Sequence, residues 1–423
     1  MAAFLIVFFV LMLIGMPIAF CMIGSSALYI IMNGLSARVI VEKLITGPNS
    51  FTLLAIPFFI LAANLMNNGG VTERIFTFCR KFVGHIPGGL GHVNIVCSII
   101  FAGMSGAAVA DAGGLGQIEL KAMRDAGFDD DFSLAVTGAS STIGPIIPPS
   151  IPAVVFAVAG SVSIGKLFIG GLIPGLVMAL GMGVVVYIWA KQKNYPRDPK
   201  STLKEKIVAF ARAFLSLLTP LIIIVGIWTG YFTPTEAAIV ATVYALFLSL
   251  IVYQTLNLRD LKKIFLDTAT STLVILIIIA SSSIFGWVLT YERVPQLASQ
   301  AVLSLVTNKY IVMLLIIAIL LVVGCFMETI AAITITTPIL LPIAESVGFS
   351  PVQAGIIMIL TLMIGLITPP VGLVTYTLAN ISGQPFYRIA KATIPFLISL
   401  IVVVLLLVLI PQLTTLLPGI MYR

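Results

Sequence analysis

Long apolar stretches with almost no charge recur along this chain, and they limit the folds that it can adopt. Examples are Leu273–Ile284, Ile311–Val323 and Ile394–Ile410. Hydrophobic residues make up 60% of the sequence and charged residues 9%, with a mean hydropathy of +1.16, whereas soluble domains have roughly 25% charged residues. Several stretches suit a bilayer, which takes about 20 residues per helix. Because backbone groups in lipid need internal hydrogen bonds, we predict an all-α polytopic membrane protein.

Other classes of protein are not indicated. The formal net charge of +7 comes from basic residues in loops between apolar stretches, so it does not indicate nucleic-acid binding. The chain has no HExxH, GxSxG or GxxxxGK[ST] motif, which argues against an enzyme and against an ATP-driven pump. His85 and His92 have no acidic or cysteine companion, so we expect no transition metal. Four cysteines without CxxC spacing are expected to be packed thiols: Cys21, Cys79, Cys97 and Cys325.

The N-terminus is expected to be part of the fold. The first 30 residues lack a basic region followed by a cleavage site, so they are interpreted as membrane helix and not as a removable signal.

The sequence contains two similar segments, one in each half of the chain. A shift of about 221 positions, the spacing between Pro148 and Pro369, places one double proline, Pro148-Pro149, on another, Pro369-Pro370. The same shift places Gly103 on Gly324 and Gly144 on Gly365. Chance matches between glycines are common in this composition, but a shared double proline at fixed spacing from them is not. We therefore predict an internal duplication.

Each copy is predicted to hold the same series of helices. In the first copy these are crossings over Ala2–Pro17, Ile18–Met32 and Phe51–Met66, an interfacial amphipathic helix over Val71–His85, a hairpin over about 88–125, a broken span over about 131–160 and a final span. Their counterparts are Phe210–Tyr231, Glu236–Gln254, Thr268–Thr290, Glu292–Asn308, a hairpin over about 310–345, a broken span over about 352–379 and a final span.

The first hairpin has basic residues at both of its ends, so we expect both ends on one side of the membrane, as in a re-entrant hairpin. Each copy then makes five full crossings, and an odd number inverts the second copy relative to the first. Inverted repeats with broken helices are typical of secondary transporters. With the Arg80 end inside, most loop cations are cytoplasmic, as the positive-inside rule requires, and both termini face outward. The basic residues left outside are Arg38, Lys43, Lys166, Arg293, Lys309 and Arg423.

The hairpin tips and the broken spans are the candidate site. Pro145, Pro148 and Pro149 interrupt a helix where lipid requires satisfied carbonyl groups. Unwound carbonyls together with Ser and Thr hydroxyls suit Na⁺, and helix N-termini suit an anionic substrate. One sodium ion is assigned to the first tip and break, and another to the second pair. The predicted sodium ligands are Ser105, Gly106, Ser140, Ser141 and Thr142, and then Gly324, Glu328, Thr329, Gly365 and Thr368.

Simpler interpretations remain open for these residues. Ser, Thr and Gly often serve only to let membrane helices pack closely. Asp111, followed by two glycines, is expected to cap the second helix of its hairpin, although a buried charge in a membrane is often functional. The acidic residues Asp125 and 129–131 are expected to form a solvated loop.

The motifs resemble one known family along nearly the whole chain. GHVNIVCSIIFAGMSGAAVADAGGLGQIELKAMRDAGFDDDF, then GASSTIGPIIPPSIP, SIGKLFIGGLIPGL, PTEAAIVA and MIGLITPPVG resemble the large membrane subunit of tripartite ATP-independent periplasmic (TRAP) transporters. Within this family, the motifs are most similar to those of the sialic-acid members. At Ala107 the chain departs from the many relatives that have a second hydroxyl there, so any ligand at this position would be a backbone group.

The resemblance implies an elevator transporter driven by sodium. It implies scaffold regions at 1–70 and 209–291, connecting arms at 71–86 and 292–308, and a transport domain from 87–190 and 309–411, with a cytoplasmic linker at 191–208 and a tail at 412–423. It also implies a separate small four-helix membrane subunit, a periplasmic binding protein that delivers substrate, surrounding lipid, and a bacterial inner-membrane location.

We therefore expect a Na⁺-coupled importer of an organic acid, such as sialic acid or a C4-dicarboxylate, with no organic cofactor. Its carboxylate would lie between the tips. The predicted substrate contacts are Ser105, Ala107, Ser141, Pro148, Thr329, Pro369 and Pro370. One alternative is a stand-alone sodium–dicarboxylate symporter with a similar inverted-repeat fold. The other is a channel or a structural membrane subunit.

Overall fold

The structure is a computed structural model that describes residues 2–306 and 308–422. The side chains of residues 2, 103–105 and 305 lie outside this description. Throughout the described part the chain is helical, with one 3-10 and one π segment and no strand. The prediction of an all-α protein is confirmed.

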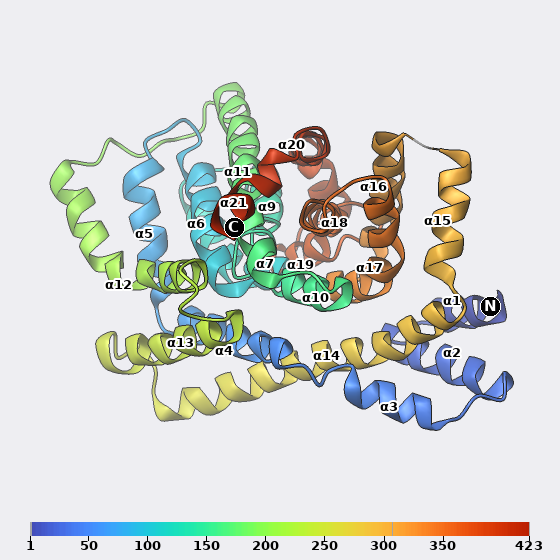
Figure 1. Ribbon diagram of the computed structural model, residues 1–423. Helices are drawn as coiled ribbons and strands as arrows, with labels where there is room; N and C mark the ends of the chain where they lie inside the picture. The colour runs from blue at the N-terminus through green and yellow to red at the C-terminus, as the bar shows by residue number, and fades with distance from the viewer. Residues whose placement is uncertain (1, 307, 423) are drawn as a thin grey trace.

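The first half contains a series of helices, a hairpin and an interrupted helix (Figure 1). The elements are α1 (Ala2–Leu13), α2 (Ile18–Met32), α3 (Arg38–Thr46), η1 (Phe51–Leu54), α4 (Ala55–Asn68), α5 (Val71–Val83), α6 (Gly89–Ser105), α7 (Ala108–Gly113), α8 (Leu115–Asp125), α9 (Asp130–Ser141), α10 (Ile151–Gly160) and α11 (Ile164–Lys193).

The second half also consists of helical elements. These are α12 (Leu203–Trp228), α13 (Pro234–Phe247), the π segment η2 (Leu248–Val252), α14 (Leu258–Tyr291), α15 (Val294–Leu305), α16 (Lys309–Phe326), α17 (Thr329–Ser346), α18 (Pro351–Gly365), α19 (Leu373–Ser382), α20 (Phe386–Leu409) and α21 (Gln412–Met421).

Local sequence signals set several of these boundaries. Thr202 and Thr233 begin α12 and α13 with capping boxes, in which each threonine hydroxyl accepts from a backbone N–H and a glutamate three residues later returns the bond. The second arm of the first hairpin was predicted as one helix. It is instead two, α7 and α8, which meet at Gly114.

Helices pack in matching pairs, some of them between the two halves and some within one half. Away from the hairpins, α2 packs on α14 while α4 packs on α13. Around the interruptions, α6 packs on α9 and α16 on α18, and the second segments exchange partners, so that α10 contacts α17 and α7 contacts α19. Figure 1 shows the first set as a lower layer, along which α14 runs, and the second set as a block above it.

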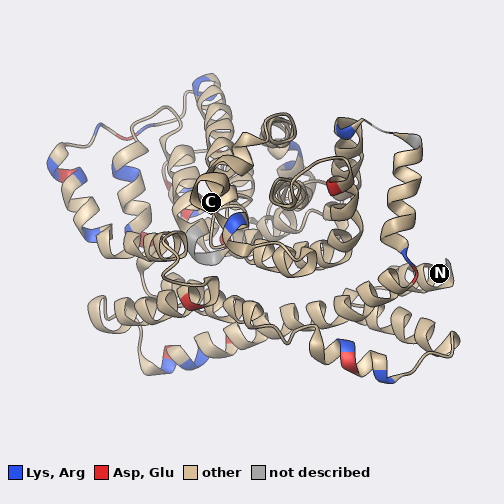
Figure 2. Cartoon of the chain, in the orientation of Figure 1, with Lys and Arg blue, Asp and Glu red and all other residues tan. Residues whose placement is uncertain are grey.

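The helices are suited to a membrane. Within the described residues, eight are long and apolar enough to cross a bilayer. Among them are both arms of the second hairpin, α16 and α17, whereas α1, α2, α6, α10 and α18 are shorter apolar helices. Charged side chains lie mainly toward helix ends and in connecting loops (Figure 2). The protein is therefore a multi-pass membrane protein.

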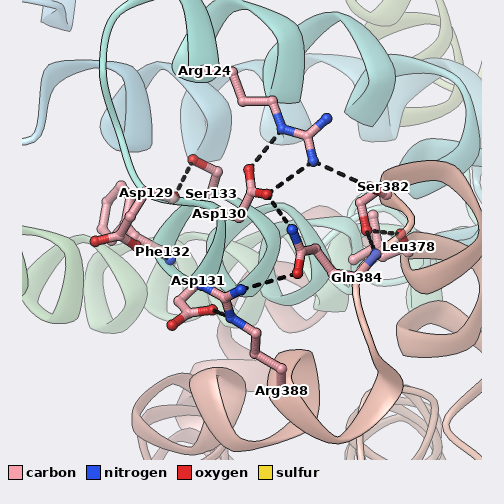
Figure 3. A network of polar contacts seen from close by, with 10 residues as sticks. All are labelled: Arg124, Asp129, Asp130, Asp131, Phe132, Ser133, Leu378, Ser382, Gln384 and Arg388. Atoms are coloured by element: carbon pink, nitrogen blue, oxygen red, sulfur yellow. Dashed lines mark hydrogen bonds and ion pairs between the residues drawn. The ribbon is translucent and has the colours of Figure 1, made fainter.

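The acidic residues after α8 are not a solvated loop, so that prediction is wrong for three of them. Asp129 caps α9 by accepting from the Phe132 N–H at 2.8 Å. Asp130 accepts from Arg124 Nε at 2.7 Å and from Gln384 Nε2 at 2.7 Å, and Asp131 pairs with Arg388 (Figure 3). The network connects the start of α9 in the first half to the start of α20 in the second, which a single-sequence pattern does not indicate.

We predict that Asp130→Asn lowers the stability of the purified protein by about 1 kcal/mol. The hydrogen bond from Arg124, with a further one from Gln384, holds the pKa of Asp130 below its usual value. A carboxyl group with a depressed folded-state pKa contributes stability above its unfolded pKa of about 4 and loses it as the pH falls through the lower folded value. Thermal unfolding in detergent should therefore depend less on pH below about pH 4 in the variant. Asp125→Asn, at the exposed last residue of α8, is the control and should change neither quantity.

Candidate functional site

Both hairpin tips and both interruptions meet at one cavity of about 280 Å³. It is lined by Ala107, Ala108 and Val109 of the first hairpin, Glu328, Thr329 and Ile330 of the second, Pro145, Ile151 and Pro152 of the first interruption, and Leu366, Leu373, Tyr376 and Thr377 of the second, with Ile275 of α14. The sequence prediction that these four segments come together is supported by this cavity.

Four helices begin at the cavity. Its lining includes first-turn residues of α7, α10, α17 and α19, which place their amino ends around one space. The first residues of a helix have unpaired N–H groups and the positive end of the helix dipole, both of which favour an anion. Neither α7 nor α19 has a side chain capping its first turn. The cavity can therefore offer backbone N–H groups to a negatively charged group.

The first tip fits tightly against the first interruption. Gly106 has a φ of +61°, which favours glycine, and Ala107 returns to an extended conformation before α7 begins. A Cβ on Gly106 would lie 2.9 Å from the Pro149 carbonyl oxygen. The backbone of the tip at Gly106 therefore lies directly against the break. The side chain of the predicted ligand Ser105 lies outside the described residues.

The hydroxyls at the end of α9 are buried and bonded. Ser141 donates to the Gly138 carbonyl at 2.9 Å and Thr142 to the Ala139 carbonyl at 2.6 Å. Ser140 donates to Asn94 Oδ1 of α6 at 2.5 Å. The first two keep lone pairs near the break, as a cation ligand requires, whereas Ser140 connects two helices.

The helices α6 and α9 run in the same direction. A Cβ on Gly91 would lie 2.7 Å from Phe132, and further along both helices Asn94 bonds Ser140. Their carbonyl ends consequently lie toward the same end of this pair.

The second tip begins with an acidic cap. The Glu328 carboxylate accepts hydrogen bonds from the N–H groups of Ile330 at 2.8 Å and Ala331 at 3.2 Å. It thereby satisfies two backbone donors at the start of α17 that have no partner within the helix. Glu328 also lines the cavity, beside the buried Thr329. One carboxylate oxygen is thus engaged in capping, and the group brings negative charge to the tip.

The second interruption touches the second hairpin through backbone. A Cβ on Gly365 would lie 2.5 Å from the Gly324 carbonyl carbon, so these glycines allow α16 and α18 to approach. The Gly372 N–H donates to the Cys325 carbonyl at 3.2 Å, and the Thr368 hydroxyl donates to the Ile364 carbonyl at 2.6 Å. The carbonyl ends of α16 and α18 therefore meet, with a hydroxyl oxygen beside them.

Not every predicted substrate contact lines the cavity. Ala107 and Thr329 do, whereas Ser141, Pro148, Pro369 and Pro370 do not. Pro148 is buried and the second double proline is exposed. The sequence prediction missed Ile275, Tyr376 and Thr377, which lie in regular helices without a local signal.

Two acidic residues lie buried in the second arm of the first hairpin. Asp111 caps neither α7 nor α8, whose N-cap residues are Ala107 and Gly114, so the capping prediction is wrong. Its Oδ2 would lie 2.5 Å from a Cβ on Gly144, next to the first interruption. Glu119 of α8, which the sequence prediction missed, is 2% exposed. Among the described residues no group of three or more His, Cys, Asp or Glu side chains could hold a metal ion.

One face of α14 follows the site beyond the cavity. Ile275 lines the cavity between the tips, and Ile279, Ser282, Ser283, Gly286 and Thr290 line a neighbouring cavity of about 270 Å³. That second cavity is closed by α10 and α17, which contribute Val155 and Thr334. The helix thus forms a wall along two adjoining spaces.

A comparison with known families identifies the family of this chain. The family described as "Tripartite ATP-independent periplasmic transporter, DctM component" matches residues 5–413. The chain belongs to this family. It is therefore a transporter permease subunit and not an enzyme, and the resemblance seen in the sequence motifs is confirmed.

Relatives and a solved structure show how far this similarity extends. The chain is 44% identical to the sialic acid TRAP transporter large permease protein SiaM of Vibrio cholerae, over 96% of both chains. It is 39% identical to the C4-dicarboxylate TRAP transporter large permease protein DctM of Pseudomonas aeruginosa, over 91% of this chain and 90% of that one. The fold is similar to the crystal structure of the Alcanivorax borkumensis YdaH transporter, with a TM-score of 0.63 and 13% identity, covering 88% of this DctM-family chain and 86% of the other.

We predict that Gly365→Ala destabilises the protein by about 1–3 kcal/mol, because the added methyl group would meet the backbone of Gly324 and force α16 from α18. Thermal unfolding of purified protein measures this loss. Gly419→Ala is the control, since a Cβ there meets nothing within 4 Å. Equal melting temperatures for the two variants would contradict the close approach of these helices.

Proposed function

We propose that this DctM-family protein is the permease of a sodium-coupled importer that moves a carboxylate-bearing organic acid across the bacterial inner membrane. The observation that carries the proposal is the arrangement of helix ends. Amino ends surround a cavity between the two halves, while carbonyl ends pair within each half. This arrangement suits an anion between two cations.

The sodium sites are assigned to the carbonyl ends. The first consists of the end of α9 with the tip of the first hairpin, through Ser105, Gly106 and the oxygens of Ser141 and Thr142. The second consists of the ends of α16 and α18, through Gly324, Gly365 and the Thr368 hydroxyl, with Glu328 and Thr329 opposite. Support comes from buried or partly buried hydroxyls that donate to helix carbonyls and so keep lone pairs for a cation. Ser140 is a weaker candidate because its hydroxyl is bonded to Asn94.

The substrate carboxylate is assigned to the cavity between the tips, beside Ala107 and Thr329. The walls are mainly apolar, with Tyr376 and Thr377 as further polar groups that could orient a hydroxylated substrate. The names of the relatives indicate sialic acid for one and C4-dicarboxylates for another. The shared chemistry is a carboxylate, so we assign that class of substrate to this chain.

Transport is proposed to follow an elevator mechanism. The lower layer of α2, α4, α13 and α14 would be the scaffold, α5 and α15 the arms, and the block containing both hairpins the moving domain. The continuous face of α14 beside two adjoining cavities supports a fixed wall along which the block moves. Since the family is tripartite, a small membrane subunit and a periplasmic binding protein are the proposed partners.

The proposal is tested by uptake into proteoliposomes that contain this chain, its small subunit and its binding protein. Replacing Na⁺ by K⁺ should abolish accumulation against a gradient. Accumulation that continues without Na⁺ would refute the coupling, and a flux that never exceeds equilibrium would indicate a channel. Efficient uptake by this chain alone would favour a stand-alone symporter.

Thr368→Val should raise the sodium concentration for half-maximal uptake about tenfold, which corresponds to about 1.4 kcal/mol of lost binding. The substitution removes a proposed ligand oxygen at the second interruption. Thr361→Val is a matched control, because the Thr361 hydroxyl also donates to the carbonyl four residues earlier, at 2.7 Å, but within α18. Equal sodium dependence in the two variants would remove Thr368 from the site.

Ile275→Trp should reduce uptake to below about a tenth at unchanged stability, because the indole would occupy the cavity between the tips. Ile277→Trp is the control, on an exposed face of the same helix. Initial rates at saturating Na⁺ and the melting temperature of each variant are the measurements. Normal uptake by Ile275→Trp would show that substrate does not pass this wall.

A further inference from the structure

A larger cavity, of about 880 Å³, lies apart from the hairpin tips, between α5 and α12. The end of the π segment closes it through Val252 and the adjoining Tyr253. Figure 1 shows α5 and α12 side by side at one edge of the molecule, and Figure 2 shows basic residues gathered on both. This edge is on the side that the positive-inside rule assigns to the cytoplasm.

The cavity has a surplus of positive charge. Four cations line it, Arg74, Lys81, Lys204 and Arg212, against two carboxylates, Glu73 and Glu205. Four minus two leaves a formal charge of +2. Both carboxylates are included in this sum, and one of them already forms an ion pair. Glu205 pairs with Lys81 at 3.1 Å and accepts from the Thr202 N–H at 2.8 Å. The uncompensated charge therefore lies on Arg74, Lys204 and Arg212, with Glu73 nearby.

Specific contacts hold the walls in place. The Arg74 guanidinium lies 3.7 Å above the centre of the Tyr253 ring and donates to the Gly70 carbonyl at 2.7 Å. Next to Lys81 along α5, Arg80 pairs with Asp198 at 2.7 Å, and the Asp198 N–H donates to the Gly84 carbonyl at 3.0 Å. These bonds attach the loop before α12 to the end of α5. The cavity is therefore a fixed feature between two helices and a loop.

Apolar surface continues from the charged groups along α12. Val208, Ala209 and Leu215 form the cavity wall beside the cations. Phe210 and Phe214, on the same helix, are 45% and 44% exposed. A molecule that fills this space would meet cations at one end and hydrocarbon along the rest. Inorganic phosphate would use only the first of these surfaces, whereas a phospholipid would use both.

We propose that this cavity binds the phosphate headgroup of an anionic phospholipid from the cytoplasmic leaflet, with its acyl chains along α12. Basic pockets between membrane helices on this side recognise anionic headgroups, and guanidinium groups match phosphate oxygens geometrically. The +2 charge balances one headgroup that carries two phosphates, or two singly charged headgroups. A bound lipid would connect α5 to α12 at the membrane surface.

The test uses the purified full-length chain in detergent, titrated with phosphatidylglycerol, cardiolipin, phosphatidylcholine or inorganic phosphate. Native mass spectrometry and thermal unfolding are the readouts. We expect the two anionic lipids to remain bound and to raise the melting temperature, and the other two ligands to have no effect. Equal stabilisation by phosphatidylcholine would overturn the proposal, and stabilisation by inorganic phosphate alone would reassign the site to a soluble anion.

Matched variants locate the binding. The double variant Lys204→Gln with Arg212→Gln should weaken anionic lipid binding at least tenfold. The control Lys193→Gln with Arg197→Gln removes the same charge from exposed positions that do not line the cavity, and it should bind as the unaltered protein does. Equal weakening in both variants would show charge attraction without a site. Should the first variant melt early without lipid, the comparison of headgroups on the unaltered protein still decides the outcome.

Discussion

A backbone group that is not hydrogen-bonded costs several kcal/mol in hydrocarbon. Two helices of this protein are nevertheless interrupted, which leaves four additional helix ends. The carbonyl ends of α9 and α18 and the amino ends of α10 and α19 all result from two interruptions. Each set of ends needs a partner that the helix itself cannot supply. The two hairpins bring further helix ends to the same place, and side-chain caps satisfy part of the demand. Ser150 accepts from the Ala153 N–H at the start of α10, and Glu328 does the same for α17. What remains unsatisfied is a set of dipoles with opposite signs at separate positions, which is what a protein needs to hold a cation and an anion together.

The packing of the two halves explains why these positions are arranged as they are. Within one half, a hairpin arm packs on the interrupted helix that follows it, so that carbonyl ends are grouped by local connections. Between halves, the second segments exchange partners, so that amino ends are grouped by long-range packing. A single copy would leave α10 without α17 and α7 without α19, and the central cavity would lack half of its walls. The contacts among Arg124, Asp130, Gln384 and Arg388 join the same two halves at their edge (Figure 3).

The parts of the fold that the sequence predicts are those with strong local chemistry. Proline pairs, glycines and a glutamate at a hairpin tip mark the interruptions and turns, and the structure has a break or a tip at each of them. Features that depend on distant neighbours were missed or misjudged. In the sequence Ile275 is one apolar residue among many, and only the path of α14 beside the hairpin tips makes it part of the cavity wall. Nothing in the sequence near Asp130 indicates its hydrogen bond with Gln384. Asp111 was expected to cap a helix because two glycines follow it, but packing places it against Gly144 and leaves Gly114 at the junction.

The length of α14 has a consequence for how the membrane acts on the protein. At 34 residues it is about 51 Å long, while the hydrocarbon layer is only about 30 Å thick. Its charged first turns extend into the headgroup region, and the rest crosses at a slant. A thinner or thicker bilayer changes the angle between α14 and the membrane normal. Ile275 lies near the middle of this helix, so a change in its slant moves this wall of the central cavity less than it moves either end of the helix.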